Sequence, residues 1–271
     1  MTSAAASSPA TAAESSPQAT SQPTAQPTPQ PVGILLAGGR GVRYDPSGQC
    51  NKLLAPLIHG AQPGVPIALL AAQHMRAVLA RVIAVVRPDG AHAPALARLL
   101  EDAGCEVLVT AAAQRGMGAS LAAGVRASLT ADTNKSLAAG VRASLTADTN
   151  KSLAAGVRAS LTADTNKSLA AAVSASNSAS GWVIALADMP ALAPATIAAV
   201  SAALLSDDAI AAAWYRGVRG HPVGFGRAHG VALAQLDGDT GARALLNDPR
   251  LIRIDTEDAG VLRDVDSPDA L

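Results

Sequence analysis

Short apolar runs that alternate with amphipathic helical patterns are the feature that most constrains the fold of this 271-residue chain. Such alternation is typical of a parallel or mostly parallel sheet covered by helices. Two runs, 209–215 and 221–225, flank the turn 216–220 and are expected to pair antiparallel. We therefore predict an α/β fold, a mostly parallel, Rossmann-like domain of three layers with a small antiparallel element. The expected strands are 32–37, 81–87, 105–110, 181–187, 209–215, 221–225, 251–255 and 261–266, and the expected helices are 66–80, 93–103, 194–204 and 240–246.

Two segments differ from this pattern. Residues 1–31 contain almost only Ala, Ser, Thr, Pro and Gln, with Glu14 as the one charge. Such a composition cannot bury enough apolar surface to offset the entropy of ordering, so it predicts a disordered tail before a single domain at 32–271.

The second segment is a tandem repeat. A 16-residue unit, Ser-Leu-Ala-Ala-Gly-Val-Arg-Ala-Ser-Leu-Thr-Ala-Asp-Thr-Asn-Lys, begins unchanged at 120, 136 and 152, and a fourth copy decays after Ser168. Leu121, Val125 and Leu129 form one helical stripe. Because solenoid repeats have periods of about 20 to 50 residues, we expect an expansion inserted in one helix at about 120–167. The alternative is a chain of short helices, each broken at Asp-Thr-Asn. The first copy alone would complete an ordinary domain.

Charge and composition narrow the classes of partner. The chain has 21 basic and 21 acidic residues without a basic run, which argues against nucleic acid or an anionic membrane as the main partner. No apolar run reaches the roughly 18 residues that span a bilayer, and the tail lacks a signal-peptide pattern, so a cytoplasmic location is expected. Cys50 and Cys105 make neither a disulfide framework nor a zinc pattern.

A glycine turn follows the first expected strand. Gly38, Gly39 and Gly41 let backbone N–H groups approach an anion, and Arg43 and Lys52 can neutralise its charge. The spacing matches neither the dinucleotide-binding nor the Walker pattern. The turn therefore predicts a triphosphate site, and the alternative is a glycine-rich surface turn with solvated cations.

Two further segments are expected at the same crevice. Asp188 ends the apolar strand 181–187, and ligands of open α/β sheets bind at the carboxyl ends of strands. A carboxylate there suits Mg²⁺ with its phosphate ligands, although a turn-forming Asp is the alternative. The segment 114–120 follows the strand 105–110, and its glycines and Ser120 could leave backbone N–H groups for a ligand or simply cap a helix.

Six motifs in order resemble those of the molybdenum cofactor nucleotidyltransferases, the MobA-like branch of the nucleotide-triphosphate transferases, and most closely the cytidylyltransferase group. The motifs are Leu36-Ala-Gly-Gly-Arg-Gly-Val-Arg43 with Lys52, Gly116-Met-Gly-Ala-Ser-Leu121, Ala187-Asp-Met-Pro190, Arg219-Gly-His-Pro-Val223, Leu236-Asp-Gly-Asp-Thr-Gly-Ala-Arg243 and Asp264-Val-Asp-Ser-Pro268. The connection from Arg43 to Lys52 is longer than is usual in that family, which leaves open whether Lys52 reaches the phosphates.

The resemblance implies a role for each matched residue. Arg43, Lys52 and Asp188 would be catalytic, and Asp188 and Asp266 would hold the metal, with Asp264 a less favoured candidate. The nucleotide would be bound by Leu36, Ala37, Gly38, Gly39, Gly41, Arg43, Lys52, Gly116, Met117 and Ser120. The acceptor would be bound by Gly220, His221, Pro222, Asp239 and Arg243.

The implied reaction is transfer of a nucleoside monophosphate from CTP or GTP to a phosphorylated acceptor, with release of pyrophosphate and Mg²⁺ as cofactor. Molybdopterin is the implied acceptor, and a molybdoenzyme that receives the product is an expected partner. The base stays open, because Leu-Ala-Gly-Gly resembles the guanylyl branch and Leu-Ala-Asp-Met-Pro the cytidylyl branch. The alternatives are a nucleotidyltransferase for sugar phosphates or other metabolites, and a catalytically inactive nucleotide-binding or cofactor-handling partner.

Overall fold

A seven-stranded sheet forms the centre of the computed structural model, which describes residues 29–267 apart from 42, 48, 60–61 and 145–178. The strand order is β3-β2-β1-β4-β6-β5-β7. Among the described strands, β6 alone runs antiparallel to its neighbours, and every other pair is parallel. The mixed, mostly parallel sheet is thus confirmed. The strands are β1 (Gln30–Ala37), β2 (Val82–Val86), β3 (Glu106–Val109), β4 (Ala179–Leu186), β5 (Ile210–Tyr215), β6 (Val218–Gly226) and β7 (Ile252–Asp255).

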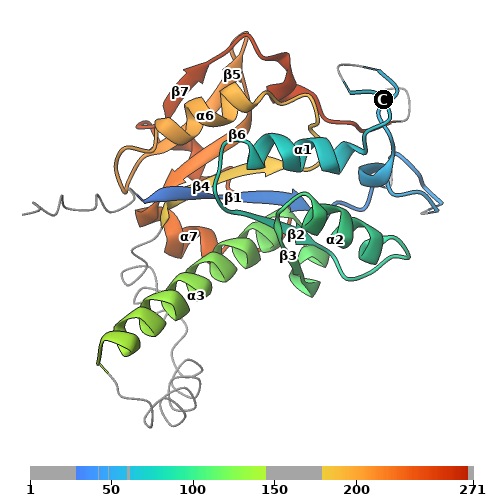
Figure 1. Cartoon of the computed structure of the whole chain (residues 1–271). Coiled ribbons are helices and arrows are strands. Elements are labelled where there is room, and N and C mark those ends of the chain that lie inside the picture. The colour runs from blue at the N-terminus through green and yellow to red at the C-terminus, as the bar shows by residue number, and fades with distance from the viewer. Residues whose placement is uncertain (1–28, 42, 48, 60–61, 145–178, 268–271) are drawn as a thin grey trace, which may run out of the picture.

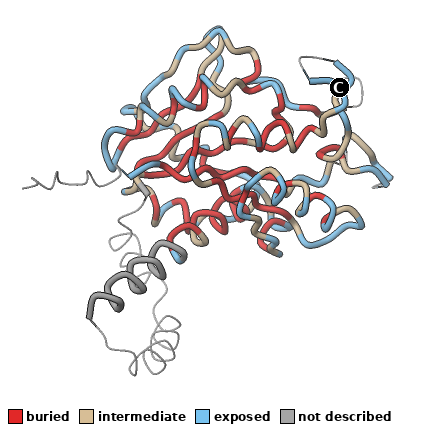
Figure 2. Tube along the Cα trace, in the orientation of Figure 1, coloured by how far each residue is buried: buried red, intermediate tan, exposed pale blue. Residues whose placement is uncertain are grey.

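Helices cover both faces of the sheet, as the three-layer prediction requires (Figure 1). One face packs against α1 (Ile67–Arg76), α2 (Ala93–Asp102) and α6 (Pro194–Ala202). The opposite face packs against α3 (Met117–Ser144) and α7 (Gly230–Ala234). Successive residues of β1 point to opposite faces of the sheet. Leu35 packs in the apolar cluster on the side of α1, α2 and α6, and Ile34 packs in the cluster on the side of α3 and α7. The central strands are consequently buried on both faces (Figure 2).

Helix α3 contains the first copy of the repeat. It passes through the first Asp-Thr-Asn without a break, so the chain of short helices is wrong for residues 117–144. Leu121, Val125 and Leu129 are buried on one side, as their spacing predicted. Gly124 lies so close to the sheet that an added Cβ would come within 3.0 Å of Ile34. The rest of the repeat at 145–178 and the tail at 1–28 lie outside the described residues.

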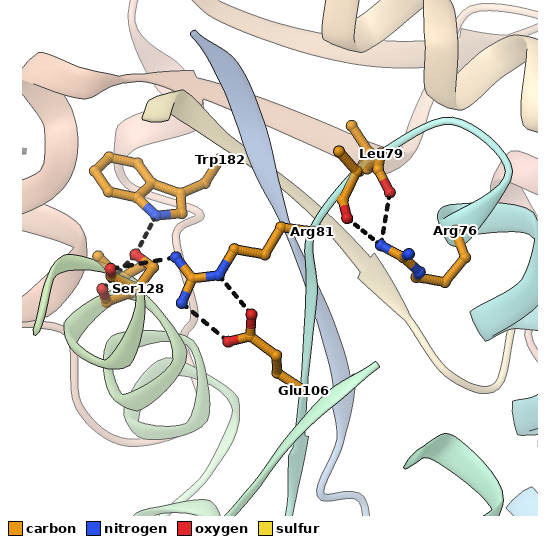
Figure 3. A network of polar contacts seen from close by, with 8 residues as sticks. Arg76, Leu79, Arg81, Glu106, Ser128 and Trp182 are labelled. Atoms are coloured by element: carbon orange, nitrogen blue, oxygen red, sulfur yellow. Dashed lines mark hydrogen bonds and ion pairs between the residues drawn. The ribbon is translucent and has the colours of Figure 1, made fainter. Parts of the chain in front are cut away.

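A polar network fastens α3 to the sheet (Figure 3). The buried Trp182 indole donates from Nε1 to Ser128 Oγ at 2.8 Å. The Arg81 guanidinium pairs with both carboxylate oxygens of Glu106, at 2.8 and 2.9 Å, and donates to the Ser128 carbonyl. Ser128 therefore links the first repeat copy to β4 and to the β2–β3 side of the sheet.

Two expected elements are wrong. Residues 240–246 form turns that lead into a 3-10 helix at Leu245–Asn247, because Gly238 and Gly241 adopt positive φ values of 65° and 57°. Residues 261–266 are not a strand, since a 3-10 helix occupies Ala259–Leu262 and the following segment makes a backbone bond from Val265 N to Asp188 O. The structure also adds α7, which the sequence analysis did not predict.

Shorter elements complete the fold. Helix α1 ends at Arg76, four residues before the predicted end, and β6 begins at Val218, three residues before the predicted start. Further 3-10 helices lie at Lys52–Leu54, Ala111–Gln114 and Arg227–His229. Within the described part of the chain, no helix is both long and apolar enough to cross a membrane.

Candidate active site

The carboxyl ends of β1 and β4 lie side by side and bring the glycine turn next to Asp188. Both border a cavity of about 530 Å³, which we call cavity A. The expectation that the turn and Asp188 face one crevice therefore agrees with the geometry. Cavity A is lined by Leu36, Gly38, Gly39, Arg40, Arg87, Ala113, Gln114, Arg115, Gly116, Met117, Ser120, Leu186, Asp188 and Asp239.

Close packing explains the glycines of the turn. A Cβ on Gly38 would come within 3.0 Å of Ala113 Cβ, and Gly41 has a φ of 62°, which favours glycine. Ala37 and Gly41 are not among the residues that line cavity A, and Ala37 faces a neighbouring cavity with Asn51 and His92.

Lys52 lies beside Asp188 despite its longer connection, although it is not among the residues that line cavity A. Its 3-10 helix begins at the Asn51 cap, whose side chain accepts a bond from Leu53 N. Lys52 Nζ donates to Asp188 Oδ2 at 2.6 Å and to the Val265 carbonyl at 3.0 Å. The longer connection therefore still brings the lysine ammonium into an ion pair with Asp188.

The extra residues before Lys52 fold into a loop around Asp45. The Asp45 carboxylate accepts bonds from Ser47 N at 2.8 Å and from Cys50 N at 2.6 Å. The Ser47 hydroxyl, followed by the Cys50 amide, lowers the pKa of Asp45. Asp45 therefore ties the two ends of this loop together.

Three carboxylates meet beside the lysine. Asp188, Asp264 and Asp266 each offer an oxygen, and these oxygens lie within 4.8 Å of one another. Arg43 Nη1 pairs with Asp266 Oδ2 at 2.6 Å, and Lys52 Nζ lies 3.5 Å from Asp266 Oδ1. Asp264, the less favoured candidate, is as much a part of this cluster as Asp266.

The neighbouring cations favour the ionised form of Asp266. Burial opposes ionisation of Asp266, but the Arg43 hydrogen bond and the Lys52 charge outweigh it and lower the pKa of Asp266 below its ordinary value. The cluster offers carboxylate oxygens, and hard divalent cations prefer oxygen ligands. The donor set therefore fits a divalent metal, with Asp188, Asp264 and Asp266 as the residues that would hold it.

A second cavity of about 520 Å³, cavity B, adjoins the first. Leu36, Met117 and Asp239 line both cavities. A Cβ on Gly220 would lie 2.0 Å from the Val261 carbonyl, so glycine is needed for β6 to pass close to the C-terminal segment. The other residues of cavity B are Leu121, Ile184, Arg219, Gly220, His221, Val223, Thr240, Gly241, Ala242, Arg243 and Leu246.

His221 lines cavity B and is half-buried, with its Nδ1 atom shielded from solvent. Its Nδ1 has no hydrogen-bond partner among the described residues. Burial lowers the pKa of His221, while a bond to the Ile184 backbone and the charges of Asp188 and Asp264 act in the opposite direction. The imidazole is therefore neutral near pH 7. Pro222, the other half of a cis peptide with His221, is buried and does not line the cavity.

Sequence reasoning missed several lining residues. Arg40 and Arg87 face cavity A, and Arg219 faces cavity B. Arg40 and Arg219 lie within two of the motifs quoted above, so the motifs could have indicated them as site residues. Arg87 follows β2 and belongs to no motif. Arg87 donates to Asp89, and this bond lowers the pKa of Asp89 to about 2.

The protein is an α/β domain with a mostly parallel sheet, whose first strand ends in a glycine turn beside an acidic cluster and two adjoining cavities. The chain matches the family model of the MobA-like NTP transferase domain at residues 33–158 and 149–254, and it belongs to this family. The two matched stretches overlap at 149–158, within the repeat.

Solved structures show the same fold. The crystal structure of Rv0371c from Mycobacterium tuberculosis is similar with a TM-score of 0.58 and 22% identity, over 90% of this chain and 96% of that one. A nucleotidyl transferase from Methanothermobacter is similar with a TM-score of 0.57 and 18% identity, over 89% of this chain and 94% of that one. Rv0371c in complex with manganese has a TM-score of 0.50 and 19% identity, over 84% of this chain and 89% of that one. Comparison with curated proteins gives no match.

Proposed function

We propose that this chain catalyses metal-dependent transfer of a nucleoside monophosphate from CTP or GTP to a phosphorylated acceptor of the molybdopterin type, with release of pyrophosphate. The observation that carries the proposal is the ion-pair cluster of Lys52 with Asp188 and Asp266. Asp188 lines cavity A together with Gly38 and Gly39 of the glycine turn. Membership of the MobA-like NTP transferase family supports a nucleoside triphosphate as donor.

Asp188, Asp264 and Asp266 would hold the metal. When bound, a divalent ion supplies charge neutralisation and orientation for the triphosphate. Mg²⁺ is the ion we expect, and the manganese complex of Rv0371c makes Mn²⁺ a suitable probe. Backbone N–H groups at Gly38 and Gly39 would face the triphosphate.

Lys52 and Arg43 would act by charge. In the described structure both cations pair with the acids of the cluster. On nucleotide binding, Lys52 would turn to the α-phosphate and Arg43 to the leaving pyrophosphate, where they stabilise the charge that develops during transfer. Neither side chain forms a covalent bond in the reaction.

The reaction balances without a side-chain nucleophile. An oxygen of the acceptor phosphate forms a bond to the α-phosphorus, and the bond from that phosphorus to the bridging oxygen of pyrophosphate breaks. A phosphate monoester is largely ionised near pH 7, so attack requires no general base. Catalysis consists of positioning and electrostatic stabilisation.

Cavity B supports an acceptor with both a ring system and an anionic group. Its lining includes Leu36, Ile184 and Val223, which offer apolar surface to a ring. Arg219 and Arg243 supply positive charge at its polar side. This mixture favours a pterin phosphate over a sugar phosphate.

The test is pyrophosphate release from purified protein with CTP, GTP, ATP or UTP, each with molybdopterin, with sugar phosphates and without acceptor. We expect release that requires molybdopterin and a divalent ion and that EDTA abolishes. Release only with a sugar phosphate would refute the acceptor, and nucleotide binding without turnover would favour an inactive binding partner.

Asp188→Asn is the informative variant, because it removes a charge from the acid cluster while it keeps the side-chain size. It should lose at least about a hundredfold in rate and weaken Mn²⁺ binding measured by electron paramagnetic resonance. Asp102→Asn, an exposed acid at the end of α2, is the matched control. Equal activity of the two variants would exclude Asp188 from the site.

A further inference from the structure

Two loops that the sequence analysis treated separately are joined at the boundary between cavities A and B. The first loop, Arg115–Gly118, includes the first two residues of α3, and the second loop, Asp237–Gly241, follows α7. Arg115 Nε pairs with Asp237 Oδ1 at 3.0 Å, and Gly118 N donates to the Gly238 carbonyl at 2.7 Å. We call this junction the clasp.

The clasp depends on glycine. A Cβ on Gly116 would lie 2.2 Å from Asp239 Oδ1 and 2.6 Å from the Gly238 backbone. A Cβ on Gly118 would lie 2.7 Å from the Asp237 carbonyl. Any side chain at either position would therefore force the two loops apart, and backbone atoms cannot yield as a flexible side-chain end would.

The clasp carries the residues shared by the two cavities. Met117 comes from its first loop and Asp239 from its second, and both line cavities A and B. The third shared residue, Leu36, is 9% exposed at the end of β1 and does not belong to either loop. The contact between the two loops therefore sets the positions of Met117 and Asp239, which lie between the cavities.

We infer that Arg115 and Asp237 are positioning residues, and that the clasp fixes the geometry in which an acceptor in cavity B meets the nucleotide in cavity A. This inference rests on the proposed function. Gly118 and Asp237 line neither cavity, and Lys52, Arg43 and the three acids lie outside the clasp. Substitutions of Gly118 and Asp237 should therefore affect the alignment of the reacting groups much more than the affinity for nucleotide. A displacement of about 1 Å can cost a factor of about a hundred in rate.

The test compares kcat, measured with the acceptor that the wild-type chain uses, with the dissociation constant for the metal–nucleotide complex, measured by calorimetry without acceptor. Gly118→Ala should lower kcat at least about tenfold and change the dissociation constant less than about threefold. Asp237→Ala breaks a partly exposed ion pair and should lower kcat about two- to fivefold.

Two further variants separate positioning from general structure. Asp237→Glu keeps a carboxylate opposite Arg115 and should recover most of the kcat lost in Asp237→Ala. Arg250→Ala, which breaks exposed ion pairs with Asp208 and Asp248 on another part of the surface, is the control, and its kcat should be unchanged. If Gly118→Ala does not fold, the charge variants still decide the question.

Unchanged kcat in every clasp variant of an active chain would overturn the clasp alone. A dissociation constant that rises in proportion to the loss of kcat would overturn it as well, because the clasp would then only hold nucleotide. A wild-type chain that transfers to no acceptor would overturn the proposed function together with the clasp.

Discussion

Substitution of Ser128 by Ala removes the partner of a buried indole. Trp182 and Ser128 are both fully buried, and the 2.8 Å bond from Trp182 Nε1 to Ser128 Oγ would be lost. A buried donor left without an acceptor costs about 1–3 kcal/mol. The Arg81 bond to Ser128 uses the backbone carbonyl and would persist, so the loss is confined to the indole and to the serine's own bond to Val125. We expect Ser128→Ala to be less stable by about 1–3 kcal/mol.

Urea unfolding followed by tryptophan fluorescence measures this change, and the melting temperature should fall by about 2–4 °C for each kcal/mol lost. Ser144→Ala is the matched control, since Ser144 is the equivalent residue of the second repeat copy. In a Trp182→Phe background the Ser128 substitution should cost much less, because the unpaired donor is gone. A Ser128→Ala variant as stable as wild type, or a Ser144→Ala variant equally destabilised, would refute the reasoning.

The remaining predictions address the lysine, the repeat and the histidine. Lys52→Ala should lower kcat more than nucleotide affinity in steady-state and binding assays, because Lys52 is expected to act on charge that develops during transfer, and full activity would remove it from the mechanism. Deletion of 136–167 should preserve circular dichroism and activity, and loss of the folded state would contradict an inserted expansion. Burial lowers the pKa of His221, so as the pH falls the imidazole is protonated in the unfolded chain before it is protonated in the folded chain. The free energy of unfolding should therefore fall as the pH drops below about 6.5. In His221→Gln, the midpoint of urea unfolding should depend less on pH between pH 5 and 7. If the midpoint changes with pH as steeply as in the wild type, His221 is not the cause.

Much of the fold was predictable because each strand or helix has its own apolar pattern within a short stretch of sequence. The apolar run that became β1 and the proline-started helix α6 were placed within two residues of their observed bounds. Residues 240–246 were misjudged, because their helical pattern is interrupted by a glycine at positive φ that only the backbone reveals. The segment 261–266 was misjudged because its apolar residues pack beside Asp188 without joining the sheet.

The site was predictable where residues stand directly after a strand. Gly39 and Asp188 follow β1 and β4, and the parallel pairing of those strands brings them together. The bond between Gly118 and Gly238 could not be predicted, because nothing in either segment indicates which distant backbone it will contact.

The sequence by itself determined that three identical repeat copies exist and that each carries the same apolar stripe. Only the tertiary structure showed what the stripe of the first copy contacts. Leu121, Val125 and Leu129 lie in one buried cluster with apolar residues of the sheet, among them Ile34 and Val85. The stripe alone cannot specify this partner, because the hydrophobic effect is non-directional and the contacts come from residues far away in the sequence.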